Sequence, residues 1–301
     1  MPLLNEAQIP ASLNARADGS TSRPLIIYIV GAGHCGSTLL SLSLDRHSDI
    51  LAVSEIVGLN AQEPGHSGGK DYRNNPFWSR VAANYQRDFE EDFWAVHFAS
   101  LTKSSKLSSA DWRKQNQNAF FSIAKTAGTS FIIDASKQPR RLQVLLQEDS
   151  VDVRVIYLTR DARAVVHSYD RKYKSFWRGF RQIRRLDPRA RSIKARFPNI
   201  PWMTLRYEDM TEDFEKTIVC ICEFCGLPFQ CKMLKPDTAS FKGIGGNRLQ
   251  LKPVKKITND KSWERDMPTW KKWFISLLMF RYQRSLGYPI FCSASKKERI
   301  K

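Results

Sequence analysis

The chain has 301 residues and a formal net charge of +18 at pH 7, with a sequence pI near 9.8. A positive field of this size attracts polyanions, so nucleic acids and anionic metabolites are both candidate partners. Residues 1–22 are polar and lack the apolar core of an export signal. We therefore expect a flexible N-terminal segment there, without a signal peptide or membrane anchor, and a soluble, cytoplasmic protein.

Five short apolar runs predict strands, at residues 25–30, 50–53, 131–134, 153–158 and 202–206. Helix-like sequence separates these runs, and strands that alternate with helices pair in parallel. The near-continuous apolar character of 25–30 and 153–158 is typical of strands covered by helices on both faces. We expect an α/β fold with a three-layer α/β/α arrangement around a central, mainly five-stranded parallel sheet.

The alternation continues along most of the chain, and no linker composition interrupts it. This favours a single domain at residues 23–292 over two small domains. Aromatic side chains at three- and four-residue spacing predict a mostly helical insertion at about 60–128. The end of the chain is basic, and we expect a C-terminal tail at 293–301.

The first predicted strand runs directly into the sequence GAGHCGST at Gly31–Thr38, which we call the phosphate loop. A glycine-rich turn between a strand and a helix points backbone N–H groups and the positive helix end at one spot, which suits phosphate or sulfate. The spacing matches the pattern G-x-x-x-x-G-K-[ST] except that Ser37 occupies the lysine position. The sequence therefore predicts a P-loop-like strand-loop-helix unit.

The missing lysine bears on the group that is transferred. In nucleotide hydrolases and kinases this lysine offsets negative charge on the phosphoryl group. A sulfuryl group carries less negative charge, so Ser37 favours sulfuryl transfer without magnesium. Two alternatives stay open: a glycine turn that binds nothing, and a small-molecule kinase that uses ATP and magnesium.

A second anion site is predicted after the fourth strand. Arg160 stands at the carboxyl end of that strand, where ligands bind in open parallel sheets, and Ser168 lies about two helical turns further on. Together the two side chains can clamp a phosphate. The alternative is a solvated helix start in which Arg160 and Arg163 pair locally with Asp161.

The two sites together resemble the motifs of sulfotransferases that use 3′-phosphoadenosine 5′-phosphosulfate (PAPS). Residues 31–40 resemble the 5′-phosphosulfate loop, and Tyr157–Ser168 resemble the 3′-phosphate site. The resemblance extends from about residue 25 to about 290 and is closest to Golgi-type and bacterial enzymes, including tyrosylprotein sulfotransferases. It implies sulfuryl transfer from PAPS to a hydroxyl or amine, release of adenosine 3′,5′-bisphosphate (PAP), and no metal. The implied PAPS contacts are Gly33, His34, Cys35, Gly36, Ser37, Thr38, Arg160, Ser168, Tyr207 and Arg248.

The resemblance also implies three catalytic residues. Glu55 follows the second predicted strand, where a glutamate of tyrosylprotein sulfotransferases acts as general base. His34 stands where many relatives carry arginine or lysine, and a nearby anion would favour the protonated imidazole that donates to the leaving group. Lys137, in a D-x-S-K turn, would face the acceptor or the sulfate.

Each of these assignments has an alternative. Glu55 can instead cap the next segment or pair with a basic residue, and His34 can bond only to backbone. Asp134 imitates the magnesium ligand of a kinase. Cysteines at 220, 222, 225 and 231 are explained better as buried thiols than as a zinc site, because a second pair at metal-site separation is missing.

Much of the positive charge lies in residues 171–196. A nucleic-acid-binding module is therefore an alternative of another class, although no recognised binding motif accompanies the charge. The apolar stripe of Phe176, Phe180 and Ile183 predicts an amphipathic helix whose basic face is solvated. We expect an acceptor that is a small molecule, a carbohydrate or a peptide, and no specific nucleic acid.

Overall fold

The computed structural model describes residues 23–59, 72–101, 107–147, 151–245, 254 and 256–290. Within these ranges five strands form one sheet in the order β2-β3-β1-β4-β5, and all neighbouring strands are parallel. The strands are β1 (Leu25–Gly31), β2 (Ile50–Ser54), β3 (Phe131–Asp134), β4 (Asp152–Thr159) and β5 (Trp202–Arg206). All five predicted strands are confirmed, and their ends differ from the prediction by no more than one residue.

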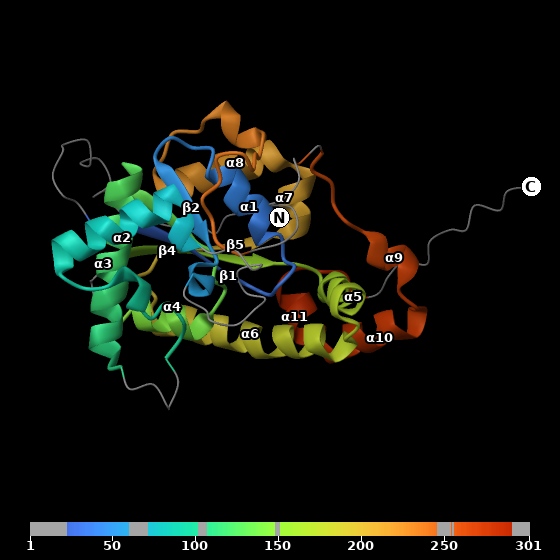
Figure 1. The fold of residues 1–301 in the computed structure, drawn as a ribbon. Helices are drawn as coiled ribbons and strands as arrows, with labels where there is room; N and C mark the ends of the chain where they lie inside the picture. The colour runs from blue at the N-terminus through green and yellow to red at the C-terminus, as the bar shows by residue number, and fades with distance from the viewer. Residues whose placement is uncertain are drawn as a thin grey trace, which may run out of the picture.

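Helices cover both faces of the sheet, which confirms the expected three-layer α/β/α fold (Figure 1). They are α1 (Ser37–Leu44), α2 (Pro76–Phe89), α3 (Ser109–Ala127), α4 (Pro139–Leu145), α5 (Ala162–Tyr173), α6 (Phe176–Arg196), α7 (Tyr207–Glu212), α8 (Phe214–Cys225), α9 (Ser262–Asp266), α10 (Thr269–Leu278) and α11 (Phe280–Ser285). Figure 1 shows α1 and α8 on one side of the sheet and α4 and α6 on the other.

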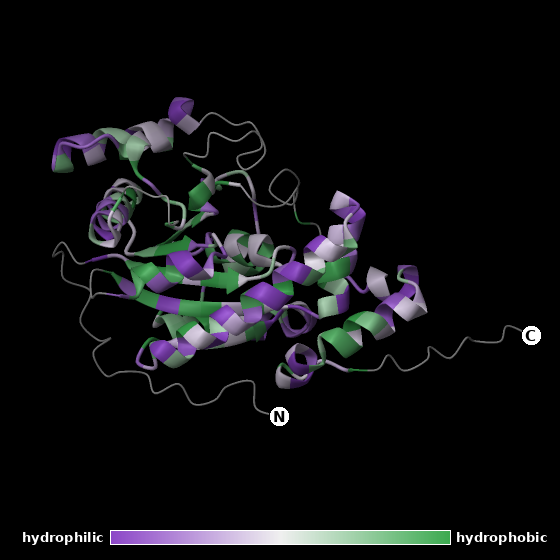
Figure 2. Ribbon diagram, turned by 90° about the horizontal axis from the view of Figure 1, so that it is seen from below, coloured by the Kyte–Doolittle hydropathy of each residue, from purple (hydrophilic) through white to green (hydrophobic). Residues whose placement is uncertain are grey.

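The sheet separates two hydrophobic cores, because successive side chains of a strand point to opposite faces. Ile26, Tyr28 and Val30 of β1 pack in a core with α2, α3, α4 and α6. The intervening side chains Ile27 and Ile29 pack with α1, α7 and α8. In Figure 2 the strands are mostly coloured hydrophobic while the surrounding helices alternate, as expected for a sheet covered on both faces.

Between β2 and β3 the chain forms α2 and α3, which pack against each other and extend the first core. Local sequence sets where both helices begin. The Asn75 side chain accepts hydrogen bonds from the N–H groups of Phe77 and Trp78 at 3.0 and 3.3 Å, with Pro76 at the first helical position. Ser108 caps α3 in the same way through the N–H of Asp111 at 3.1 Å. The helical character expected for this region therefore rests on ordinary capping signals.

A third core lies where α5, α6, α10 and α11 meet at the carboxyl end of the sheet. Phe180 and Ile183 of α6 are buried there, so the predicted apolar stripe of this helix is confirmed.

In the described part of the chain no helix is long and apolar enough to span a membrane. The same residues contain no group of His, Cys, Asp and Glu side chains arranged to hold a metal, and Cys222 and Cys225 lie buried on α8.

Candidate active site

Every strand ends at a residue or loop that the sequence analysis singled out. The phosphate loop follows β1, and Glu55 follows β2. Lys137, Arg160 and Tyr207 follow β3, β4 and β5. Because all five strands are parallel, these residues lie at one edge of the sheet, where ligands bind in open α/β folds. We call them the strand-end cluster.

The phosphate loop leads from β1 into α1 with very close backbone packing. Gly36 is the N-cap of α1 and has a φ of 99°, a left-handed conformation that favours glycine. A Cβ atom added at Gly36 would lie 2.5 Å from the Tyr207 ring, and one at Gly33 would lie 2.2 Å from the Tyr169 hydroxyl. Both glycines therefore let the backbone lie directly against aromatic rings. The α1 helix begins at Ser37, which places the positive end of its dipole at the loop.

Glu55 and Lys137 follow different strands and form an ion pair. Lys137 Nζ contacts Glu55 Oε1, and the same Nζ donates to Ser37 Oγ at 3.3 Å. The two side chains are only 13% and 28% exposed for Lys137 and Glu55. A lysine from the turn after β3 thus reaches the start of α1, the region that a phosphate-loop lysine would serve.

Left-handed turns and backbone hydrogen bonds position this pair. Ser54, directly before Glu55, has a φ of 57°, and Lys137 has a φ of 61°, although neither is glycine. The carbonyl of Ser54 accepts from the N–H of Ala135 at 2.7 Å, and the N–H of Glu55 donates to the carbonyl of Ile244 at 2.9 Å. The turns after β2 and β3 are therefore fixed to each other and to a later segment of the chain.

Arg160 connects three parts of the site. Its side chain is 7% exposed, and it donates to the carbonyls of His34 and Asp260, each at 3.0 Å. Its guanidinium lies over the Tyr207 ring, 4.3 Å from the centroid. The Arg160 Nε atom is buried and has no hydrogen-bond partner among the described residues. A buried cation with an unsatisfied donor beside the phosphate loop fits an anion.

Comparison with known proteins decides the family. A family model described as the sulfotransferase family matches residues 24–231, more than half of the chain. The chain belongs to the sulfotransferase family. It is an enzyme, a sulfotransferase, and the resemblance found in the sequence is confirmed.

Solved structures agree on the fold of this sulfotransferase. The sulfotransferase domain from the curacin biosynthetic pathway matches with a TM-score of 0.54 and 16% identity over 89% of this chain and 99% of that one. The sulfotransferase domain of the Synechococcus PCC 7002 olefin synthase matches with a TM-score of 0.51 and 19% identity, over 91% of this chain and 98% of that one. Sulfotransferase STF9 from Mycobacterium avium matches with a TM-score of 0.52 and 14% identity, over 90% of this chain and 79% of that one. A search of curated protein sequences gives no match.

His34 of the sulfotransferase is held in the phosphate loop by aromatic contacts. It has a φ of 64°, and its ring packs edge-on against Tyr169 and Tyr173 at centroid distances of 4.8 and 5.8 Å. Burial, together with the charges of Lys172, Arg160 and other nearby cations, lowers the pKa of His34 to about 4. The imidazole is therefore neutral at pH 7 in the free protein, and a bound anion would raise its pKa.

The kinase alternative predicted that Asp134 is a magnesium ligand. Asp134 is fully buried, and its carboxylate accepts from Arg141 Nε at 3.0 Å and from the N–H of Ser136 at 2.9 Å. Arg141, itself fully buried, also donates to the carbonyl of Phe98 and to Asn116. Asp134 is thus a structural anchor for α4, and its carboxylate is already bonded to Arg141 and to the backbone.

Of the alternative considered for Arg160 and Arg163, the local pair with Asp161 is present for Arg163, but the solvated helix start is wrong because both arginines are buried. Arg163 is fully buried, and its Nη2 lies 2.5 Å from Asp161 Oδ2. Asp161 in turn accepts from the N–H of Arg163 at 2.8 Å and so caps α5. Arg163 also lies over Trp263, 4.5 Å from the ring centroid, and therefore joins α5 to α9.

Four predicted contacts remain, of which Thr38 is buried on α1. Ser168 lies half-buried on α5, one residue before Tyr169. Cys35 is fully buried in the core with α1, and burial raises the pKa of its thiol, which agrees with a space-filling role. Arg248 lies outside the described residues.

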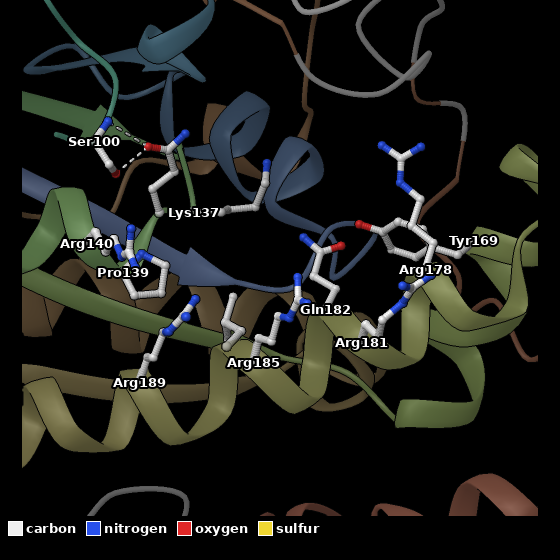
Figure 3. A pocket seen from close by; sticks show the side chains of 12 residues that line it. Ser100, Lys137, Pro139, Arg140, Tyr169, Arg178, Arg181, Gln182, Arg185 and Arg189 are labelled. Atoms are coloured by element: carbon white, nitrogen blue, oxygen red, sulfur yellow. Dashed lines mark hydrogen bonds between the residues drawn. The ribbon is translucent and has the colours of Figure 1, made fainter. Parts of the chain in front are cut away.

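The sequence analysis missed Tyr169 and Asp260, which contact Gly33 and Arg160, because both contacts depend on tertiary packing. It also assigned the basic residues of α6 to a solvated face and did not predict that some of them line a cavity. Four of these arginines line an open cavity of about 680 Å³ beside Lys137 (Figure 3). We call this cavity the basic groove; its lining residues are Ser100, Lys137, Gln138, Pro139, Arg140, Tyr169, Arg178, Arg181, Gln182, Arg185, Leu186 and Arg189.

Proposed function

We propose that this sulfotransferase uses PAPS as its donor and transfers the sulfuryl group in line to a hydroxyl or amine of an acceptor. The observation that carries the proposal is the contact of Lys137 with both Ser37 and Glu55 at the start of α1. It joins the phosphate loop, a cation and a carboxylate at one point. These are the parts that in-line transfer to a hydroxyl requires.

The strand-end cluster suits the two ends of PAPS. The phosphate loop would bind the 5′-phosphosulfate through backbone N–H groups and the α1 dipole. Arg160, with its unsatisfied Nε, and Ser168 would bind the 3′-phosphate, with Tyr207 beside them. Two predicted contacts, Gly33 and Gly36, support this assignment because any larger residue would displace the loop.

In the transfer, the bond between sulfur and the bridging phosphate oxygen breaks, a bond between sulfur and the acceptor oxygen forms, and PAP leaves. Glu55 takes the proton that the acceptor hydroxyl releases. Lys137 stabilises charge on the sulfuryl oxygens, the role that the absent phosphate-loop lysine has in kinases. In this proposal His34 donates to the bridging oxygen after the bound anion has raised its pKa from about 4.

A thermal-shift panel tests the donor. PAP at about one hundred times its dissociation constant should raise the melting temperature by about 5–10 °C, because it binds only the folded chain. ATP with magnesium should give a smaller shift. The reverse order would support a kinase, and no shift with PAP at any concentration would contradict PAPS as donor.

A further inference from the structure

The basic groove carries positive charge with no acidic side chain among its lining residues. Lys137, Arg140 and four arginines of α6 line it, against no Asp or Glu. Lys137 pairs with Glu55, but no ion pair joins the five arginines to a carboxylate within the described ranges. Asp187, the acid of α6, instead binds Arg191 and the hydroxyl of Tyr157. Grouped cations repel one another, so this charge favours an anionic ligand.

The arginines of α6 form a row. Arg178, Arg181, Arg185 and Arg189 follow one another at intervals of three and four residues, which places them along one side of the helix. The row extends over about 16 Å of helix. Figure 3 shows Arg185 and Arg189 extending from α6 on the side where Lys137 and Ser100 lie. An elongated ligand with several negative groups fits this row better than a single small anion.

One end of the groove reaches the reaction centre. Lys137 lines the groove and also contacts Glu55, the proposed base. Tyr169 lines it as well and packs edge-on against His34 at 4.8 Å. A ligand in the groove therefore lies beside the residues assigned to proton and sulfuryl transfer.

We propose that the basic groove binds the acceptor and that the acceptor is an acidic carbohydrate. This inference rests on the proposed function. Carboxylates or sulfates of the carbohydrate pair with the α6 arginines, and one of its hydroxyls reaches Glu55. The neutral side chains between the cations, Ser100, Gln138 and Gln182, offer hydroxyl and amide groups that hydrogen-bond sugar hydroxyls.

Other polyanions fit the groove less well. No lining residue belongs to a strand, so an acidic peptide has no sheet edge to join, and the apolar lining is limited to Pro139 and Leu186. Single-stranded nucleic acid needs aromatic platforms for its bases. Tyr169 is the aromatic lining residue, and it is occupied by contacts with His34 and Tyr173.

Binding measurements with defined probes test this proposal. Hexagalacturonate should bind the wild type at low salt, and maltohexaose, its neutral counterpart, should not. Replacing Arg185→Ala or Arg189→Ala should each weaken hexagalacturonate binding about tenfold, because each removes a charge-assisted hydrogen bond. Arg184→Ala is the matched control, since Arg184 is an exposed arginine of the same helix that does not line the groove.

The same proteins separate this inference from the proposed function. PAP affinity should be unchanged in Arg185→Ala, Arg189→Ala and Arg184→Ala, and melting temperatures should show that all three are folded. If the wild type fails to bind PAP, the proposed function fails. If PAP binds but maltohexaose, hexaglutamate or hexathymidylate binds as tightly as hexagalacturonate, or if Arg184→Ala weakens binding as much as Arg185→Ala, the acidic-carbohydrate assignment is overturned.

Discussion

The arginines at the end of β4 and the arginines of the basic groove have opposite environments. Arg160 and Arg163 are 6% and 0% exposed and have fixed partners in the chain. Arg185 and Arg189 are exposed and have no ion-pair partner among the described residues. A buried guanidinium must be paired to be tolerated, whereas an exposed one costs little to leave available. Arg163 is therefore a structural residue and Arg160 keeps one unsatisfied donor, whereas Arg185 and Arg189 remain available for a ligand.

This difference predicts which measurement each region will affect. Changes in the strand-end cluster or at Arg163 should alter turnover, donor affinity or folding. Changes to the α6 arginines of the basic groove should alter acceptor binding alone. Four substitutions test the first half of this comparison, from the largest expected effect to the smallest.

Glu55→Gln should give the largest change, a decrease in turnover of about 10²–10⁴-fold, because the amide cannot take the acceptor proton. PAP affinity should stay nearly the same. Steady-state kinetics together with calorimetric titration of PAP would show both effects. Full activity in Glu55→Gln would remove Glu55 as the base.

Arg163→Ala should destabilise the fold by about 3–5 kcal/mol, because it leaves the carboxylate of Asp161 buried without its main partner. Arg184→Ala, the exposed control in α6, should change the free energy of unfolding by no more than about 0.5 kcal/mol. Urea unfolding of both variants measures the contrast. Equal stability of the two variants would contradict the structural role given to Arg163.

Arg160→Ala should weaken PAP binding about tenfold or more, since it removes charge-assisted hydrogen bonds to the 3′-phosphate that are worth roughly 1.5–3 kcal/mol each. Adenosine 5′-monophosphate is PAP without the 3′-phosphate and is therefore the matched ligand, so its affinity should change much less. Calorimetry with both ligands separates loss of a phosphate contact from general loss of the site. An equal loss for both ligands would argue against the 3′-phosphate assignment.

The smallest effect concerns the protonation of His34. Its pKa is about 4 in the free protein because of burial and neighbouring cations, and a bound anion should raise it. A ligand that raises a pKa takes up protons, so at pH 5 PAP binding should take up a fraction of a proton more in the wild type than in His34→Asn. Calorimetry in two buffers of different ionisation enthalpy measures this difference. Identical proton uptake would mean that His34 stays neutral beside the anion.

Much of the fold could be predicted from the sequence, because apolar runs between helix-like segments mark buried parallel strands. The runs at 25–30 and 153–158 predicted β1 and β4 to within one residue. The strand order β2-β3-β1-β4-β5 could not be predicted, since it depends on which strands meet after long connections. The phosphate loop was identifiable because its function depends on local spacing and glycine conformation.

Several contacts around the site could not be predicted from the sequence. The ion pair of Lys137 with Glu55 depends on left-handed turns at Ser54 and Lys137, where neither residue is the glycine that would mark such a turn. The buried pair of Arg163 with Asp161 looks in sequence like an exposed helix start. The groove required α6 to lie beside the turn that carries Lys137, which is a tertiary arrangement with no local signal.

A crystal structure of the protein with PAP tests the central claim most directly. The account predicts that the 5′-phosphate lies on the phosphate loop and that the 3′-phosphate lies beside Arg160 and Ser168, with the basic groove left open. PAP bound elsewhere, or a 5′-phosphate that makes no contact with residues 33–38, would contradict the account.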